Sequence, residues 1–328
     1  MKKIYGNKQL LSILDNMIIN DRPVNSLMIY GEKGCGKKMT ADYYTMQLLC
    51  ESPEEGRPCG RCNACRNAEA GSHPDVTSVE TSGKLRGYSV ETARAVIADA
   101  FIKPNNDTGR KIYQFRDCHN MDPRTQNTLL KLIEEPPGYA YFIFTAQSKY
   151  EFLPTIISRC MCLGVSPCTH EETVQALHQY DFTDEQIISA TDCFHGNVGM
   201  CIKYINDPSL RETVDLTKKL SDSIIRKDEY ELNRVFMSAG TDRERVRSVL
   251  IMTDKLVRDA AVLAEDVNAE IIGCCPKEAR ALSEMITPLQ SGRIHDLLEK
   301  AWNSVESNVG IPLILTALCG EIMDIVIG

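Results

Sequence analysis

Residues 31–38, with the sequence GEKGCGKK, have the glycine and lysine spacing of a phosphate-binding loop. A glycine-rich turn between a strand and a helix directs backbone N–H groups at a phosphate, and Lys37 can reach a terminal phosphate. The next position usually carries Ser or Thr, whose hydroxyl holds Mg²⁺, but here it carries Lys38. The segment is therefore predicted to have the shape of an anion-binding loop without the metal ligand that hydrolysis needs. The residues expected to contact a nucleotide or a phosphate are Gly31, Gly34, Gly36 and Lys37.

A second element of a nucleotide site is also altered. The apolar run 111–115 predicts a buried strand, which in a hydrolysing site would end in Asp-Glu, one carboxylate for the metal and one for the attacking water. Here the strand is followed by Arg116 and Asp117. A guanidinium on the metal side repels Mg²⁺, and one carboxylate cannot fill both roles. If Asp117 is aligned with the metal ligand instead, Cys118 stands where the glutamate should be, so either alignment breaks the catalytic pair.

Four of the 14 cysteines lie close together in the sequence, and their spacing lets the thiolates converge on one metal ion. Because the chain shows no export signal and the cytosol keeps thiols reduced, a disulfide framework is not expected. Four sulfurs would close a tetrahedral zinc site with no open position, so the zinc should be structural. An iron–sulfur cluster, which also takes four thiolates, is the alternative. The expected ligands are Cys50, Cys59, Cys62 and Cys65.

Most of the other cysteines are interpreted as structural. The vicinal pair Cys274-Cys275 before Pro276 is interpreted as a helix end, and a redox-active pair is the alternative. Five cysteines in apolar contexts suit small core residues. These are Cys160, Cys162, Cys193, Cys201 and Cys319.

Composition limits the class of protein. At 328 residues the chain is long enough for two or three domains. No apolar run approaches the ~20 residues of a membrane helix, and no signal peptide is recognisable, so we expect a cytoplasmic protein with no membrane association. The formal net charge of −8 argues against broad independent nucleic-acid binding. A zinc-containing nucleic-acid binder using Arg57, Arg61 and Arg66 is disfavoured because nearby glutamates cancel much of that charge.

The order of the expected elements predicts an α/β domain followed by helical domains. Alternating strands and amphipathic helices indicate a parallel sheet covered by helices. The expected strands are 26–30, 75–79, 111–115 and 139–145, and the expected helices are 38–49, 89–100 and 125–134. From about residue 166 the strand signal disappears, and short helices are expected at 171–179, 183–191 and 198–206. Long amphipathic stretches, including 242–265 and 312–327, predict a separate bundle.

Residues 127–138, NTLLKLIEEPPG, followed by 153–160, LPTIISRC, resemble the AAA+ subunits of the bacterial DNA polymerase III clamp loader. That family includes the gamma/tau motor and the delta-prime stator. The match has no gaps from Lys111 to the Pro-Pro pair, and the cysteine insert has the family's placement. The resemblance implies three parts over the whole chain. They are a RecA-like AAA+ P-loop domain at 1–165 with a zinc module at about 50–65, a helical lid at 166–208 and a helical collar for oligomerisation at 215–328.

Within that family, three departures separate the chain from the motor subunits. They are Lys38 after the loop lysine, Arg116-Asp117 after the strand, and glycine in the segment 195–199, HGNVG, where the motor carries a lid arginine. The surviving motif is Ser158-Arg159-Cys160, the family's arginine-finger motif.

The resemblance therefore implies an ATPase-deficient delta-prime stator that presents Arg159, beside Ser158, to ATP on a neighbouring gamma/tau subunit. The implied partners are gamma/tau and delta, with primer–template DNA and the sliding clamp reached through the complex. The intact glycines and Lys37 are compatible with passive binding of ATP or ADP, and the loss of the metal ligand argues against it. The alternative is a gamma/tau-like ATPase that has adapted its metal site through Thr40 or Asp117.

Overall fold

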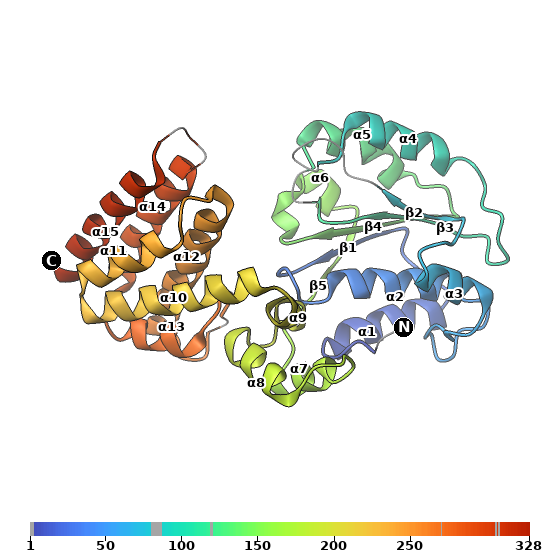
Figure 1. Cartoon of the computed structure of the whole chain (residues 1–328). Helices are drawn as coiled ribbons and strands as arrows, with labels where there is room; N and C mark the ends of the chain where they lie inside the picture. The colour runs from blue at the N-terminus through green and yellow to red at the C-terminus, as the bar shows by residue number, and fades with distance from the viewer. Residues whose placement is uncertain (1–2, 80–86, 119–120, 270, 306, 308) are drawn as a thin grey trace. The chain divides into compact units, whose positions relative to one another are not determined.

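The computed structural model describes residues 3–79, 87–118, 121–269, 271–305, 307 and 309–328. The chain forms two compact units, Met1–Gln179 and Tyr180–Gly328 (Figure 1). The boundary between these units lies inside the segment 166–208, which was predicted to be a separate helical lid. The division into three domains therefore stays a prediction.

The first unit is built on five parallel strands in the order β2-β3-β4-β1-β5. The strands are β1 (Ser26–Tyr30), β2 (Val76–Val79), β3 (Lys111–Phe115), β4 (Ala140–Ala146) and β5 (Met161–Gly164). Strand β1 lies between β4 and β5 and pairs Leu27 with Ile143 of β4 and with Met161 of β5. The expected parallel sheet is confirmed, and the short strand β5 is an addition that the sequence pattern did not predict.

Helices cover both faces of this sheet, as Figure 1 shows. One face carries α1 (Lys8–Ile19), α2 (Lys37–Leu49) and α3 (Asn63–Glu69), and the other carries α4 (Val90–Ala100), α5 (Pro123–Glu134) and α6 (Pro154–Ile157). The 3₁₀ turn η2 (Lys149–Glu151) and α7 (His170–Leu177) complete the unit. Because both faces are covered, β3 and β4 are buried along their whole length.

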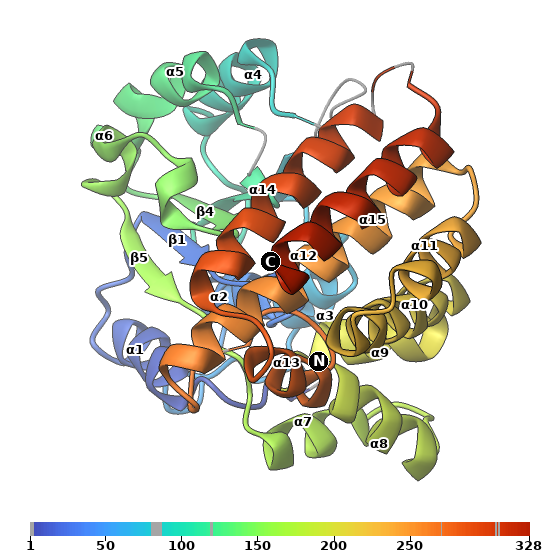
Figure 2. The ribbon, with the colours of Figure 1, turned by 90° about the vertical axis from the view of Figure 1, so that its left-hand side faces the viewer.

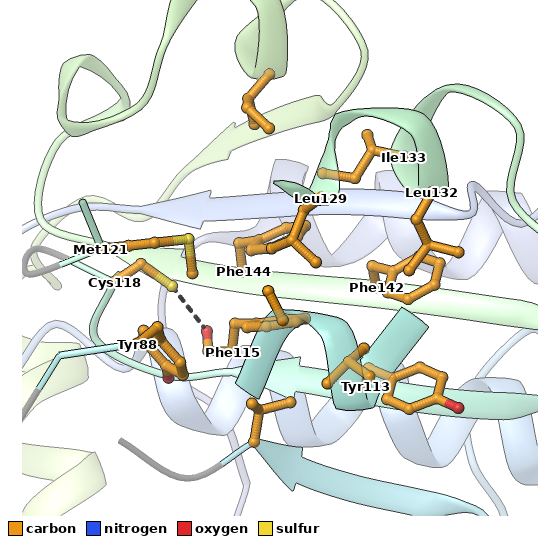
Figure 3. Packing of buried hydrophobic residues seen from close by; sticks show 14 of the residues in the cluster. Tyr88, Tyr113, Phe115, Cys118, Met121, Leu129, Leu132, Ile133, Phe142 and Phe144 are labelled. Atoms are coloured by element: carbon orange, nitrogen blue, oxygen red, sulfur yellow. Dashed lines mark hydrogen bonds between the residues drawn. The ribbon is translucent and has the colours of Figure 1, made fainter. Parts of the chain in front are cut away.

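Aromatic rings from neighbouring strands form the core under α4 and α5 (Figure 3). Tyr113 stacks on Phe142 with ring centroids 5.3 Å apart, and Phe115 stacks on Phe144 at 4.8 Å. Stacked pairs of this kind add about 0.5–1.5 kcal/mol beyond the area they bury. The resulting rigid sheet fixes the strand ends from which the site residues extend.

The second unit is helical among its described residues. Its helices are α8 (Asp184–Cys193), α9 (Val198–Asn206), α10 (Pro208–Arg226), α11 (Glu229–Ser238), α12 (Arg243–Glu265), α13 (Pro276–Ser283), α14 (Pro288–Val305) and α15 (Ile311–Ile327). Helices α12, α14 and α15 lie side by side (Figure 2). Helices α12 and α15 confirm the predicted amphipathic stretches. Among the described residues, no helix combines the length and apolar character needed to cross a membrane.

An ion pair between α12 and α14 gives this unit a pH dependence that can be tested. His295 Nδ1 lies 2.6 Å from Asp254 Oδ1, and this hydrogen bond raises the pKa of His295 above its usual value. A raised histidine pKa means that the pair stabilises the folded state fully below the unfolded pKa of about 6.5 and loses this contribution as pH rises through the folded pKa.

We therefore expect the difference in unfolding free energy between the wild type and His295→Gln to shrink as pH rises from about 6 to about 8. The difference should stay below about 1 kcal/mol, because the pair is partly exposed. Trp302, the only tryptophan of the chain, lies beside His295 on α14, so its fluorescence reports the unfolding of this unit. A difference that grew with pH would contradict the assignment.

Candidate nucleotide, metal and arginine sites

The phosphate-loop segment connects the end of β1 to the first residue of α2, as predicted. Gly34 and Gly36 have φ values of 94° and 97°, which favour glycine. A Cβ at Gly31 would lie 2.3 Å from the carbonyl oxygen of Val165, because the loop passes directly over the end of β5. The backbone therefore has the tight course that the sequence indicated.

Lys37 is directed into its own loop. Its side chain is buried, and Nζ donates hydrogen bonds to the carbonyl oxygens of Gly31 at 2.7 Å and Glu32 at 2.9 Å. Burial lowers the pKa of Lys37, while Asp117, Glu32 and Glu151 among others act in the opposite direction. Several carboxylates thus already act electrostatically on this one ammonium group. Because like charges repel, they would oppose a triphosphate at the same place.

Arg116 is held at the end of β3 by a local network. Its Nη2 lies 2.7 Å from Asp42 Oδ1 on α2, and its Nε donates to Gln114 Oε1 at 3.0 Å. The next residue, Asp117, has a left-handed φ of 53° and donates its backbone N–H to Thr145 Oγ1 at 2.9 Å. In the alignment that places Arg116 on the metal side, a guanidinium paired with Asp42 would stand where a hydrolysing site needs a metal-binding carboxylate.

Thr40 does not offer a ready replacement for the missing hydroxyl. It lies one turn into α2, and its Oγ1 donates back to the carbonyl oxygen of Gly36 at 3.1 Å. A Ser or Thr directly after the loop lysine would be at the start of the helix beside the phosphates. Position 38, by contrast, holds an exposed lysine.

The structure brings the four predicted metal ligands together, with their sulfur atoms all within 4.8 Å of one another. A tetrahedral site with Zn–S bonds of about 2.3 Å has edges of about 3.8 Å, so a small contraction would suit one ion. Thiolates that bind different irons of a cluster lie further apart because two metal atoms separate them. The donor set and its compactness therefore fit a single tetrahedral ion such as zinc, which would link Cys50, Cys59, Cys62 and Cys65.

Backbone N–H groups support the sulfur atoms. Cys59 N donates to Cys50 Sγ at 3.2 Å, Cys62 N to Cys59 Sγ at 3.4 Å, and Cys65 N to Cys62 Sγ at 3.4 Å. Hydrogen bonds from the N–H groups of Arg61 and Cys62 lower the pKa of Cys59 to about 6, whereas burial raises the pKa of Cys65. The last of these N–H bonds also caps the start of α3, so the cysteine turn and the helix form one unit.

A carboxylate on α1 anchors the cysteine insert, and sequence reasoning missed it. Asp15 accepts hydrogen bonds from Tyr43 Oη at 2.5 Å, Gln47 Nε2 at 2.7 Å and Arg57 Nε at 3.4 Å. A Cβ at Gly56 would lie 2.3 Å from the backbone oxygen of Asp15, so glycine is needed for this close approach. The only local signal was an acidic residue on an amphipathic helix, which usually indicates a solvated face.

Arg159 lies at the surface between α6 and β5. Its Nη1 donates to the carbonyl oxygen of Thr155 at 2.9 Å and to Ser158 Oγ at 3.2 Å, and its Nη2 lies 2.5 Å from Glu134 Oε1. The Arg159 side chain is 37% exposed and that of Glu134 is 42% exposed. Glu134, the last residue of α5, belongs to the quoted family motif, but the sequence did not identify it as the partner of Arg159.

Comparison with known proteins supports the family expected from the sequence. A family model described as "DNA polymerase III, delta subunit" matches residues 6–169. The chain is 31% identical over 137 residues to DNA polymerase III subunit delta' of Pseudomonas aeruginosa, covering 42% of each protein. It is 30% identical over 161 residues to the corresponding Bacillus subtilis subunit, covering 48% of this chain and 47% of that protein.

The matches to the delta' subunits thus span less than half the length of those relatives. A longer match links the chain to DNA polymerase III subunit gamma of Buchnera aphidicola, with 25% identity over 285 residues, 82% of this chain and 73% of that protein. The family model covers the sheet, the phosphate-loop segment, the four cysteines and Arg159. Because the family model matches residues 6–169, half of this 328-residue chain, the chain belongs to the DNA polymerase III delta-subunit family.

Proposed function

We propose that the chain is a delta-prime-type stator of the bacterial clamp loader, an AAA+ subunit that does not hydrolyse ATP itself. The observation that carries this proposal is Arg116, which is ion-paired with Asp42 where a metal-binding carboxylate would be required. The position of Lys38 and the carbonyl contacts of Lys37 agree with it. Without a metal site, the loop can at most hold a nucleotide or a phosphate passively.

In this proposal, the chain assembles with gamma/tau and delta subunits in the cytoplasm and reaches the sliding clamp and primer–template DNA through the complex. The helices at 215–328 serve as its collar, and the segment 166–208 serves as its lid. Zinc bound by the four cysteines has a structural role, since a site with four protein thiolates leaves no position for substrate.

The second part of the proposal is that Arg159 acts in trans as an arginine finger. A guanidinium is always charged and planar, so it can neutralise the charge that develops on a transferring γ-phosphate. Glu134 is the counter-ion of Arg159, and exposed pairs of this kind contribute only about 0.2–1 kcal/mol. A neighbouring subunit's ATP can therefore compete with Glu134 for Arg159 at small cost.

The proposed inactivity can be tested on the isolated chain with ATP and Mg²⁺. We expect no phosphate release above the level of a Lys37→Ala variant, because the metal ligands are missing. Steady turnover by the wild type that disappears in Lys37→Ala would refute the stator assignment. Equilibrium dialysis of the same two proteins with ADP separates passive nucleotide binding from hydrolysis.

The alternative function is a gamma/tau-like motor with an adapted metal site. The observations that favour it are the gamma match over 82% of the chain and the position of Asp117, whose charge acts on Lys37. A motor of this kind requires Mg²⁺ and nucleotide to bind together at Lys37. If ADP binding strengthens with Mg²⁺ and Asp117→Asn removes that dependence, the motor is favoured over the stator.

A further inference from the structure

A cluster of thiols lies in the second unit, far in sequence from the four proposed zinc ligands. Cys193 is the last residue of α8, and Cys275 is the N-cap residue of α13. Both are buried, as are the neighbouring Cys201 and Cys274. The sequence indicated a small core residue at Cys193 and a helix end, or a redox-active pair with Cys274, at Cys275, so the pairing of Cys193 with Cys275 is visible only in the structure.

A backbone hydrogen bond joins Cys193 and Cys275. The N–H of Cys275 donates to the carbonyl oxygen of Cys193 at 3.0 Å, and each thiol alters the pKa of the other, so the two side chains are neighbours. A disulfide needs Cα atoms about 4.4–6.8 Å apart, and a backbone hydrogen bond brings two residues close enough for this geometry. Cys275 has a left-handed φ of 64°, which is uncommon for a residue other than glycine.

A cation lies beside the thiol pair. Lys218 of α10 places its Nζ 3.5 Å from Cys193 Sγ. The contact with Cys275, followed by burial, raises the pKa of the Cys193 thiol, and Lys218 acts in the opposite direction. The other groups near these sulfurs are the hydroxyl of Tyr204, the thiols of Cys201 and Cys274, and the carboxylate of Glu278 near Lys218.

We propose that Cys193 and Cys275 form an oxidation site at which hydrogen peroxide produces a disulfide between α8 and α13. A thiolate of the pair attacks the peroxide, so that an S–O bond forms, the O–O bond breaks and hydroxide leaves to take up a proton. The second sulfur, after losing its proton, attacks the sulfenic sulfur, and an S–S bond replaces the S–O bond as water leaves. Two thiols lose two protons and two electrons, and the peroxide is reduced to two waters.

Lys218 acts as a positioning residue in this step. Its ammonium group compensates the negative charge of the attacking thiolate in a buried environment, where an unpaired charge is costly. Because burial keeps most of the pair protonated at neutral pH, the reaction should be slower than that of an exposed thiol. The product would tie two helices that are separated by a long segment of chain, including α9 and α10.

The test uses the full-length, zinc-loaded chain, reduced and then treated with limiting hydrogen peroxide. After free thiols are blocked, the protein is digested without reductant and its peptides are mapped by mass spectrometry. We expect a cross-linked peptide pair containing Cys193 and Cys275, about 2 Da lighter than the two thiol peptides together. Cys275→Ser should abolish the pair, whereas Cys274→Ser should retain it.

The role of Lys218 is measured by the rate of pair formation. Lys218→Met should slow it several-fold, because the thiolate loses its neighbouring positive charge, whereas the exposed neighbour Lys219→Met should leave it unchanged. Mapping of the wild type is decisive even if a variant does not fold. The proposal is wrong if both thiols stay free even after the proposed zinc ligands have oxidised completely, or if Cys275 pairs with Cys274 instead. Equal rates in the two lysine variants would remove Lys218 from the mechanism.

Discussion

Cys65→Ser is expected to release the bound metal and to unfold the cysteine insert. Cys65 is fully buried, and its apolar cluster contains little besides Met46, Cys50 and the other cysteines. Such a small cluster cannot hold the insert by itself, so a metal bound by the four cysteines would supply much of its stability. Structural zinc contributes about 10–16 kcal/mol in zinc-finger peptides, and losing one of four ligands should cost several kcal/mol locally.

The measurement is metal content together with limited proteolysis. The wild type should hold one zinc per chain and resist cleavage at 51–69, whereas Cys65→Ser should hold less than one and be cut there. Cys168→Ser is the matched control, because its thiol lies outside the cluster and contacts the carbonyl oxygen of Tyr5. Full zinc occupancy in Cys65→Ser, or iron in the purified wild type, would contradict the zinc assignment.

Damage in Cys65→Ser should stay within the insert. The two cores that cover the sheet include none of the four proposed ligands. Asp15 also contacts Gln47 of α2 and Arg57 of the loop before α3, and these contacts do not depend on the metal. Hydrogen exchange should therefore rise in α3 while β1 and β4 remain protected. Exchange that rose throughout the first unit would show that the metal supports the whole sheet.

Arg159→Ala is expected to reduce ATP hydrolysis by the reassembled loader without disturbing its assembly. Arginine fingers contribute roughly 10³–10⁵ in rate at the site they serve. Because sites on other subunits would continue to turn over, the loss in total DNA-stimulated hydrolysis should be smaller than this. The surface position of Arg159 makes the substitution mild for folding.

Arg159→Lys distinguishes charge from shape. Lysine keeps the positive charge but lacks the planar fork that contacts phosphate oxygens in pairs, so it should restore only part of the activity. Complex formation is checked by measuring the mass of the assembled loader. The kinetic measurement is the rate of ATP hydrolysis in a single turnover. Unchanged hydrolysis in an assembled Arg159→Ala loader would end the arginine-finger proposal while leaving the family assignment untouched.

Glu134→Gln should have the opposite effect, since it removes the counter-ion that competes with ATP for Arg159. An exposed pair of about 0.2–1 kcal/mol corresponds to an increase of about 1.4- to 5-fold in hydrolysis where finger engagement limits the rate. Glu135→Gln is the matched control, because this exposed neighbour lies outside the Arg159 contact. If both variants behave like the wild type while Arg159→Ala is slow, Glu134 does not restrain the finger.

The sequence by itself determined the features that depend on neighbouring residues. The strands 26–30 and 111–115 and the helix after the loop follow from local apolar patterns and were found within one residue. Ser89 is the N-cap of α4, as expected, because its side chain satisfies an N–H group only three residues away. The four clustered cysteines were recognisable for the same reason, since short spacings limit where their sulfurs can go.

Only the tertiary structure decided which distant residues meet. The strand order, the short strand β5, the anchor at Asp15, the counter-ion of Arg159 and the pairing of Cys193 with Cys275 all join segments far apart in the chain. No local pattern encodes such partners, because a charge or a thiol on a helix has the same sequence signature whether it faces solvent or a particular neighbour. Packing of the completed sheet and helices selects among those possibilities, and the site chemistry follows from that selection.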